Sequence, residues 1–530
     1  MRSEPDLVHI RESTINLTTT KPQLATATMS KNKNKKRKQN DVTGNLPNKQ
    51  FKTTNKPITP PLEGDDRSDD GVKPNGGEPT SVHAVVSPEE LEIAAETLAE
   101  LAKHPALLKS RACKDLRVAV WDFRQACPTG LNSTGASSNL TGRITAALAD
   151  GKFTDAKVLL AEMRIRGESP KLGALCRWVR DLDVISGVST LEDETPTGRT
   201  ARDKELISVL DGVLRVCGVI DTNPSADFDP STPICVQETW DLRPLSSAPT
   251  LQTHASVLDG SIFLSAPPNL HESLRVIEST PGPLRKPPNH HDAILYTTKP
   301  GGVPLSSVPP PITYHHHPVV PNLSLATRVL SPAECQAIIA AGETATFLPD
   351  APLREDGDVS VLAHNFYWVV DQPFHDTLWS RVSPFVPRTV DGRMARGLNR
   401  RFRVYRYVPG AEYRAHIDGA WPPSGILQDD TYVYDASPEG GKQSSLFTFL
   451  IYLNDEFEGG ETTFFLPSAR EGVLNAYPVR PVMGGVAVFP HGDARGALLH
   501  EGTGVRRGAK YVIRTEVEYD VEATVGVAGE

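Results

Sequence analysis

The stretch RFRVYRYVPGAEYRAHID, residues 401–418, combines a strand pattern, a turn and a pair of metal-ligand residue types. Aromatic and β-branched residues are frequent in 402–408, as is typical of a β-strand, and Pro409-Gly410 marks the turn that follows. In His416-Ile417-Asp418, an imidazole and a carboxylate two positions apart point to the same side of an extended chain. The stretch therefore predicts a strand that presents two ligands together.

A second histidine, His500, lies far enough along the chain for several strands to separate it from His416. Two histidines and one carboxylate, with the opposite face left open, form the donor set of non-haem Fe(II) oxygenases. In a rolled-up sheet, strands that are distant in sequence lie side by side, so that His416, Asp418 and His500 would converge on one metal ion. Lys510, on the next predicted strand, suggests that a dicarboxylate is bound beside that metal.

The His-x-Asp pattern by itself is weak evidence for a metal site. Such pairs are expected by chance in this composition, and three occur: His290/Asp292, His416/Asp418 and His491/Asp493. The first lies in proline-rich sequence, and the third lies in a region where Pro490 and Gly492 favour a turn. Only the second follows a strand pattern and leaves enough chain for several strands before His500.

The predicted closing strand, 509–519, carries two cations on one face, because Lys510, Val512 and Arg514 alternate with the residues between them. If that face lines the interior, a bound carboxylate would offset the cost of burying a cation without a partner. If the face lies outside, both cations are solvated. Arg514 lies about 13 Å from Lys510 along a strand, too far for both to hold one small carboxylate. We favour Lys510, with Arg514 structural or near the rim of the pocket.

The strand candidates are 402–408, 446–453, 485–490 and 509–519, separated by glycine and proline. Short antiparallel strands in this arrangement suit a two-sheet jelly roll, of which the cupin-like barrel is one form. A helix that opens at Ser331-Pro332-Ala333-Glu334 precedes them. The fold class expected is therefore α+β.

Residues 320–522 resemble the Fe(II)- and 2-oxoglutarate-dependent oxygenase superfamily, in its prolyl 4-hydroxylase-like branch. The matching motifs are Arg403-Val404-Tyr405-Arg406-Tyr407, Pro409-Gly410, His416-Ile417-Asp418, Tyr452-Leu453-Asn454-Asp455, Gly459-Gly460-Glu461-Thr462, Gly485-Val486-Ala487-Val488-Phe489-Pro490, Leu499-His500-Glu501-Gly502 and Lys510-Tyr511. The resemblance implies a double-stranded β-helix, which is a jelly roll, as the catalytic domain.

The resemblance further implies that His416, Asp418 and His500 ligate Fe(II) as the catalytic centre. The implied reaction is hydroxylation of a C–H bond by O2, with 2-oxoglutarate converted to succinate and CO2 and with ascorbate as a helper reductant. Halogenases of this superfamily lack the carboxylate ligand, so that Asp418 favours hydroxylation.

The same resemblance assigns the co-substrate site. Lys510 would pair with the distal carboxylate of 2-oxoglutarate, and Tyr407 would hydrogen-bond to that group. Thr462 would line the same pocket.

Residues 419–445 depart from the compact pattern of the family by a long insertion directly after Asp418. We expect this insertion to cover the substrate, because long loops beside a site often act as lids, and an ordinary surface excursion is the alternative. The family acts on peptidyl proline, on other protein residues and on small molecules, so that shared fold does not decide the substrate.

Residues 1–82 have almost no apolar periodicity and are expected to be a disordered tail. The basic run Lys31–Lys38 within it is of the nuclear-import type, or simply a solvated tail. Met29, just before this run, is an alternative start of the protein.

Residues 83–221 are expected to form an α-helical domain. Its first helix begins at a capping box, Ser87-Pro88-Glu89-Glu90, and the further helical stretches predicted are 115–126, 140–150, 153–166, 171–182 and 202–217. Residues 222–320 are proline-rich and are expected to be an irregular linker with short strand-like pieces, such as 293–296. The oxygenase domain would follow at 321–522, with a short tail at 523–530.

Composition and charge narrow the class of protein. The 530 residues include 45 prolines and 38% apolar residues, which predicts two or three domains with linkers. The net charge of −9 speaks against a general nucleic-acid binder. Six scattered cysteines and the lack of a signal peptide favour an intracellular protein of the nucleus or cytoplasm. No apolar run is long enough to cross a bilayer.

The sequence therefore favours an intracellular hydroxylase that acts on a protein or peptide, since the helical region and basic tail resemble recruitment devices. A small-molecule substrate is the alternative. Two rival functions are a non-catalytic interaction protein that retains the fold and a nucleic-acid demethylase, against which the acidic net charge speaks.

Overall fold

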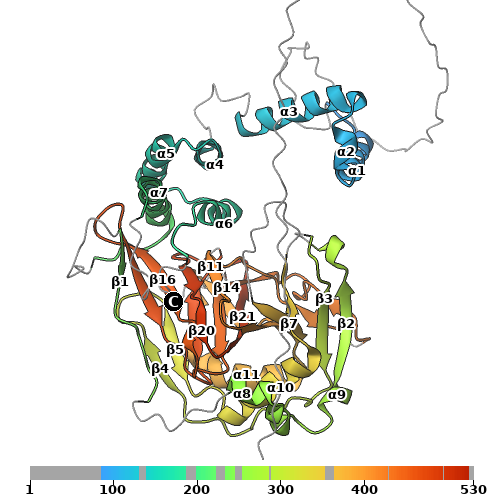
Figure 1. Ribbon diagram of the computed structural model, residues 1–530, viewed down its shortest axis with the longest axis vertical. Helices are drawn as coiled ribbons and strands as arrows, with labels where there is room; N and C mark the ends of the chain where they lie inside the picture. The colour runs from blue at the N-terminus through green and yellow to red at the C-terminus, as the bar shows by residue number, and fades with distance from the viewer. Residues whose placement is uncertain are drawn as a thin grey trace, which may run out of the picture. The chain divides into compact units, whose positions relative to one another are not determined.

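The structure is a computed structural model, shown in Figure 1, and describes the chain in several stretches. These are residues 85–129, 139–186, 199–222, 233–244, 253–285, 288–351, 363–427, 429–492 and 494–523. The predicted disordered tail, the basic run and Met29 lie outside them. The chain divides into two units, Met1–Ala95 and Glu96–Glu530, and the catalytic candidates all lie in the second.

The predicted helices are confirmed at the level of single elements. Helix α1 (Pro88–Ala102) begins at the expected capping box, in which the Glu90 backbone N–H donates to Ser87 Oγ over 3.2 Å and the Ser87 N–H donates to Glu90 Oε2 over 2.9 Å. The helices that follow are α2 (Pro105–Leu108), α3 (Lys114–Thr129), α4 (Leu140–Ala149), α5 (Phe153–Ile165), α6 (Leu172–Asp181) and α7 (Ala201–Cys217). Among the described residues, none of the helices is long and apolar enough to span a membrane.

The described part of the second unit contains two large sheets and two small two-stranded sheets. The small ones pair β12 (Gly425–Ile426) with β13 (Tyr432–Val433) and β15 (Glu458–Gly459) with β20 (Val505–Arg507). The smaller of the two large sheets contains β1 (Ile234–Val236), β17 (Leu474–Val479), β16 (Thr462–Pro467), β19 (Leu499–Gly502) and β11 (Tyr413–His416), in that order. The main path of the larger runs β2 (Leu274–Thr280), β3 (Ala293–Thr298), β7 (His364–Val369), β10 (Arg401–Tyr407), β21 (Lys510–Asp520), β14 (Gln443–Tyr452), β18 (Val486–Pro490), β5 (Ser324–Thr327) and β4 (Thr313–His316). Three short strands pair alongside this path: β6 (Leu348–Pro349) pairs with β7, β9 (Arg393–Leu398) pairs with β21, and β8 (Thr389–Val390) pairs with β9.

The chain crosses repeatedly between the two sheets. Strands β10, β14, β18 and β21 lie in the larger sheet, whereas β11, β16, β17 and β19 lie in the smaller. The strands predicted at 402–408, 446–453, 485–490 and 509–519 correspond to β10, β14, β18 and β21 and are confirmed. This crossing brings β11 beside β19, although several strands separate them in sequence.

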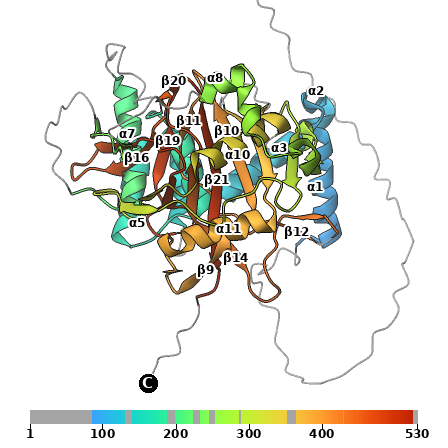
Figure 2. The same cartoon turned by 90° about the horizontal axis from the view of Figure 1, so that it is seen from below.

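Helices cover the outer faces of both sheets. On the larger sheet, α10 (Pro332–Ala345) and α11 (Gln372–Val382) pack through Ile338, Ile339 and Leu378 against Phe402 and Ile513, and Figure 2 shows both helices over this sheet. The helix predicted to open at Ser331 is confirmed as α10, and the structure shows that it begins with a capping box formed by Ser331 and Glu334. Apolar burial of this kind is the main stabilising contribution to the fold.

Helices α4 to α7 pack on the smaller sheet, as Figure 1 shows, and share one apolar cluster with Ala415 and Ile417 of the β11 region. Ser186 Oγ accepts from the Ala415 backbone N–H over 2.7 Å, and Arg414 pairs with Asp183 over 2.8 Å. These helices therefore support the segment that carries His416 and Asp418.

The expectation that residues 222–320 form an irregular linker is wrong for much of this segment. Strand β1 pairs with β17, β2 and β3 extend the larger sheet through β7, and β4 pairs with β5. The strand-like piece expected at 293–296 is confirmed as part of β3. The other runs between prolines were too brief to give a strand pattern, but they can pair with the open edge of an existing sheet. The domain boundaries themselves remain predictions.

Candidate metal centre

His416 and His500 face each other across two neighbouring strands. They are register partners in the antiparallel pair of β11 and β19, and Asp418 follows two residues after the end of β11. One candidate ligand atom from each of the three residues lies within 4.8 Å of the others. The Nε2 atoms of His416 and His500 lie 3.4 and 3.6 Å from the Asp418 carboxylate. The three residues predicted from the sequence are thus brought together.

Backbone carbonyls determine which imidazole nitrogen is available in each histidine. His416 Nδ1 lies 2.7 Å from the Arg414 carbonyl oxygen, and His500 Nδ1 lies 3.1 Å from the Leu498 carbonyl oxygen. Since a carbonyl oxygen only accepts, both Nδ1 atoms carry the proton and both Nε2 atoms keep a free lone pair. Burial lowers the pKa of His500 to about 3, so that this ring is neutral at physiological pH, as a metal ligand must be.

Asp418 is a buried carboxylate that two side chains orient. Thr448 Oγ1 donates to Asp418 Oδ2 over 2.7 Å. Arg514 Nε donates to Oδ1 over 3.1 Å, and Arg514 Nη2 forms an ion pair with the same oxygen, also over 3.1 Å. Burial alone would raise the pKa of Asp418, but the Arg514 guanidinium and the two imidazoles lower it well below its usual range. Asp418 is therefore held ionised, as coordination of a cation requires.

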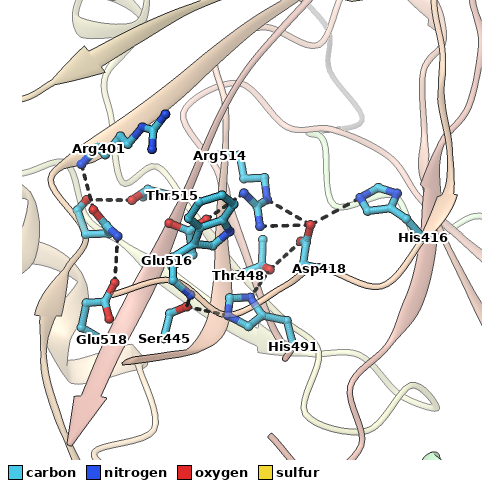
Figure 3. A network of polar contacts seen from close by, with 12 residues as sticks. Arg401, His416, Asp418, Ser445, Thr448, His491, Arg514, Thr515, Glu516 and Glu518 are labelled. Carbon is cyan, nitrogen blue, oxygen red and sulfur yellow. Dashed lines mark hydrogen bonds and ion pairs between the residues drawn. The ribbon is translucent and has the colours of Figure 1, made fainter. Parts of the chain in front are cut away.

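A chain of hydrogen bonds continues from Thr448 away from Asp418, as Figure 3 shows. His491 Nδ1 lies 2.7 Å from Thr448 Oγ1, and His491 Nε2 lies 2.9 Å from Ser445 Oγ. Because the Thr448 proton goes to Asp418, His491 Nδ1–H donates to Thr448 and Ser445 donates to Nε2. Burial lowers the pKa of His491 to about 3, which keeps the ring neutral in this role.

Sequence reasoning missed this supporting chain. It placed His491 in a turn and did not identify Thr448 or Ser445. The only local signal was the third His-x-Asp pair, His491/Asp493, in which Asp493 lies outside the described residues. In the remaining pair, Asp292 accepts the Gly282 backbone N–H over 2.8 Å, as a loop-closing residue does.

The other predicted residues lie in the same cavity as the three candidate ligands. Its volume is about 40 Å³, and its lining includes His416, Asp418, His500, Tyr407, Thr462, Lys510, Val512 and Arg514. The inner face predicted for Lys510, Val512 and Arg514 is therefore confirmed. The Tyr452 and Thr462 hydroxyls are 2.9 Å apart at the Lys510 end.

Lys510 is a buried ammonium group without a carboxylate beside it. Its Nζ donates to the Gly460 carbonyl oxygen over 2.8 Å and lies 5.5 Å from the centre of the Tyr407 ring. Burial lowers the pKa of Lys510 to about 8. Among the described residues, no carboxylate forms an ion pair with Nζ. The charge of Glu461 acts to raise the pKa of Lys510, but Glu461 pairs with Arg480, so Nζ remains available for an anion.

Arg514 contrasts with Lys510, because carboxylates already surround it. Besides Asp418, it pairs with Glu516 over 2.8 Å. The expectation that Arg514 is structural or lies near the pocket's rim agrees with this arrangement.

Comparisons with known proteins give a family match for part of the chain. The model of the 2OG-Fe(II) oxygenase superfamily matches residues 402–515. These residues include all three candidate metal ligands and Lys510. A comparison with curated proteins gave no match, so the family match rests on this segment.

Several solved structures resemble part of the chain. A viral collagen prolyl hydroxylase of Paramecium Bursaria Chlorella virus-1, in complex with 2OG, is 20% identical, with coverage of 38% of this chain and 97% of that chain and a TM-score of 0.24. A Pseudomonas putida prolyl-4-hydroxylase is 19% identical, with coverage of 37% and 91% and a TM-score of 0.24. A Trichoplax adhaerens prolyl hydroxylase, in complex with a peptide fragment of hypoxia inducible factor, is 15% identical, with coverage of 37% and 83% and a TM-score of 0.26.

Proposed function

We propose that this chain is an Fe(II)- and 2-oxoglutarate-dependent dioxygenase that hydroxylates a C–H bond, because residues 402–515 match the model of the 2OG-Fe(II) oxygenase superfamily. The balanced reaction is R–H plus O2 plus 2-oxoglutarate, giving R–OH, succinate and CO2. The observation that carries the proposal is one buried cavity with a His-Asp-His cluster and a carboxylate-free Lys510.

The fold proposed for this domain is a double-stranded β-helix, the jelly roll expected from the sequence. The order β10-β21-β14-β18 in one sheet and β17-β16-β19-β11 in the other supports it, because successive strands wind from one sheet to the other. We assign the catalytic domain to 321–522, with strands from 222–320 added to its sheets and the helical region 83–221 before it.

The donor set fits Fe(II). His416 and His500 would each provide Nε2 and Asp418 a carboxylate oxygen, which is the facial two-histidine, one-carboxylate set with open positions for other ligands. When bound, the iron supplies the activation of O2 that no side chain here can provide. The protein would hold each imidazole in one tautomer, keep His500 neutral and keep Asp418 ionised.

The opposite end of the cavity fits the distal carboxylate of 2-oxoglutarate. The Lys510 ammonium would bind it through a charge-assisted hydrogen bond, with Tyr407 as a second donor and Thr462 in the lining. Ascorbate as a helper reductant belongs to the same proposal.

We place the activity on a protein or peptide side chain, such as proline, in the nucleus or cytoplasm. A small molecule is the alternative substrate. The intact ligand cluster favours catalysis over a purely structural role for the domain.

The test measures succinate and CO2 formed by the full chain after anaerobic loading with Fe(II) and addition of 2-oxoglutarate, O2 and a cell extract. We expect the two products in equal amounts and a mass increase of one oxygen atom in a component of the extract. His416→Ala removes one ligand and should abolish both signals. His315→Ala, an exposed histidine on β4, is the matched control and should retain them. Iron-independent turnover, or equal turnover by His416→Ala, would contradict the proposal.

A further inference from the structure

A second cavity adjoins the metal-ligand cavity on the same inner face of the larger sheet. Its volume is about 70 Å³, and Tyr367, Arg401, Arg403, Trp421, Arg514 and Glu516 are among the residues that line it. Arg514 lines both cavities. A molecule in the second cavity would thus lie next to the arginine that holds Asp418.

The strand register fixes the order of these groups along the sheet. In the pair of β10 and β21, Tyr407 lies opposite Lys510 and Arg403 lies opposite Arg514. Arg401 lies two residues beyond Arg403 on the same face of β10. Lys510 and Arg401 therefore stand at opposite ends of one inner face, with the candidate metal ligands between them, and Figure 3 shows Arg401 on the other side of Arg514 from His416.

The three arginines of this cavity differ in their partners. Arg403 contacts the Asp350 carboxylate, and Arg514 contacts Asp418 and Glu516. Arg401 forms no ion pair with any described residue, and its guanidinium instead lies over the Tyr367 ring at 4.9 Å and near the Trp421 ring at 5.9 Å. Arg401 is thus a positioned cation whose hydrogen-bond donors remain available.

The insertion after Asp418 contributes an aromatic side chain, Trp421, to the lining of this cavity. Trp421 is fixed by its backbone, because its N–H donates to Ser445 Oγ and its carbonyl oxygen accepts the Ser445 N–H, both over 2.9 Å. The ring centre of Trp421 lies 6.3 Å from that of Tyr434, and their side chains are 38% and 51% exposed. An open aromatic surface therefore lies beside the Arg401 cation.

We infer that this cavity selects a substrate with a carboxylate close to the C–H bond that is oxidised, and that Arg401 is the residue that recognises the carboxylate. A guanidinium binds a carboxylate through two parallel hydrogen bonds, which fixes orientation as well as charge. The aliphatic part of the substrate would pack on Trp421. The inference rests on the proposed function, since it names the substrate class of that site.

The carboxylate has two possible sources, an acidic side chain of a peptide or a small carboxylic acid. Two pools separate them. The first pool contains ten-residue peptides with amidated C-termini. Half of these peptides contain Asp and Glu, and the other half have the same sequences with Asn and Gln in their place. The second contains small aliphatic carboxylic acids and their amides. Each pool is incubated with the full chain, Fe(II), 2-oxoglutarate and O2, and products with one added oxygen are identified by mass spectrometry.

We expect acid-containing members of one pool to be oxidised at least about tenfold more than their amides. Arg401→Gln should reduce this ratio to below about twofold, and Arg401→Lys should keep part of it, because charge remains without the planar fork. Arg396→Gln, an exposed arginine on β9 that pairs with Asp520, is the matched control and should keep the full ratio.

Three results would overturn the inference while the proposed function stands: equal oxidation of acids and amides, a preference that survives in Arg401→Gln, or succinate formation without a product from either pool. If the wild-type chain forms no succinate with Fe(II) under any condition, the proposed function fails and the inference fails with it.

Discussion

Lys510 and Arg514 lie on the same strand and the same face, at the two ends of one cavity, yet their surroundings are opposite. Arg514 is neutralised by Asp418 and Glu516, each about 3 Å away, in the manner of a structural ion pair. Lys510 has a backbone carbonyl as its hydrogen-bond partner, and burial lowers its pKa to about 8. The charge of Arg514 is balanced by protein carboxylates without a ligand, whereas the charge of Lys510 would be balanced by a bound anion.

This difference explains how one cavity can hold two cations, one that orients a carboxylate of the protein and one that remains available for a ligand. At one end, a cation stabilises the carboxylate that would bind the metal. At the other end, the Lys510 ammonium would bind the distal carboxylate of the proposed co-substrate. Substitutions at the Arg514 end should therefore change metal binding or stability, whereas substitutions at the Lys510 end should change the binding of 2-oxoglutarate.

The largest effect is expected from Asp418→Ala, which removes the only carboxylate of the metal cluster. Turnover of 2-oxoglutarate to succinate should fall by at least roughly 1000-fold, because the two imidazoles alone leave the metal weakly held. Metal content is measured in the same samples. Asp435→Ala, an exposed aspartate of the insertion, is the control. Normal turnover with bound iron in Asp418→Ala would refute the site.

Next is stability, where the two cations should differ. Without metal or 2-oxoglutarate, Arg514→Met should destabilise the fold by about 3–5 kcal/mol, because Asp418 and Glu516 remain buried without their cation. Lys510→Met should leave the free energy of unfolding unchanged or raise it. The substitution leaves no buried carboxylate without its ion-pair partner, and it removes the cost of burying an ammonium group. Urea unfolding of the metal-free variants measures both. Equal destabilisation by the two substitutions would remove the basis of the comparison.

Lys510→Met should act on the co-substrate instead. The KM for 2-oxoglutarate should rise by about 100-fold, the scale of a lost hydrogen bond between charged groups. Lys510→Arg should recover part of the affinity, because the positive charge remains. Steady-state kinetics at saturating Fe(II) would distinguish this result from a loss of kcat with unchanged KM, which would speak against the assignment.

Thr448→Val tests the supporting chain at the Arg514 end. The change keeps the shape of the side chain but removes the hydrogen bond to Asp418 and leaves His491 Nδ1–H without its acceptor. Affinity for Fe(II) should fall by about tenfold, at the lower end of such outer-sphere effects. Competition with a metal chelator measures it, and an unchanged affinity would show that Arg514 alone orients Asp418.

The smallest effect concerns pH and the Lys510 end. Burial, the main cause, lowers the pKa of Lys510 to about 8, so that the ammonium loses its proton as pH rises through this value. Since only the protonated form attracts a carboxylate, the KM for 2-oxoglutarate should rise by about threefold between pH 7.5 and 8.5. Lys510→Arg should abolish this rise, because arginine stays charged. A rise that persists in Lys510→Arg would assign the titration to another group.

Local patterns were sufficient for the strands and for the ligand set. His416 and Asp418 share a face through simple alternation, and Lys510 and Arg514 do so on β21, so these placements could be predicted. The contact of Arg514 with Asp418 could not, because it depends on how β11 folds over β21. The hydrogen-bond chain of Ser445, Thr448 and His491 could not be predicted either. These residues lie on two strand segments that meet only in the folded sheet, and no spacing in the sequence indicates that their side chains are hydrogen-bonded.

Within 222–320, the strand-like piece at 293–296 lies in β3, whereas β1, β2 and β4 escaped prediction for a related reason. Each of β1 and β4 is only three or four residues long and gains its order from pairing with β17 or β5, not from its own pattern. Proline-rich composition is therefore a poor guide to irregularity where a sheet edge is available.

The most direct test of the account is an anaerobic crystal structure of the full chain with Fe(II) and 2-oxoglutarate, with iron located by anomalous scattering. The account predicts one iron bound by His416 Nε2, His500 Nε2 and an Asp418 oxygen, with the distal carboxylate of 2-oxoglutarate hydrogen-bonded to Lys510 Nζ. Iron at other residues, or a distal carboxylate bound to Arg514 while Lys510 is empty, would contradict it.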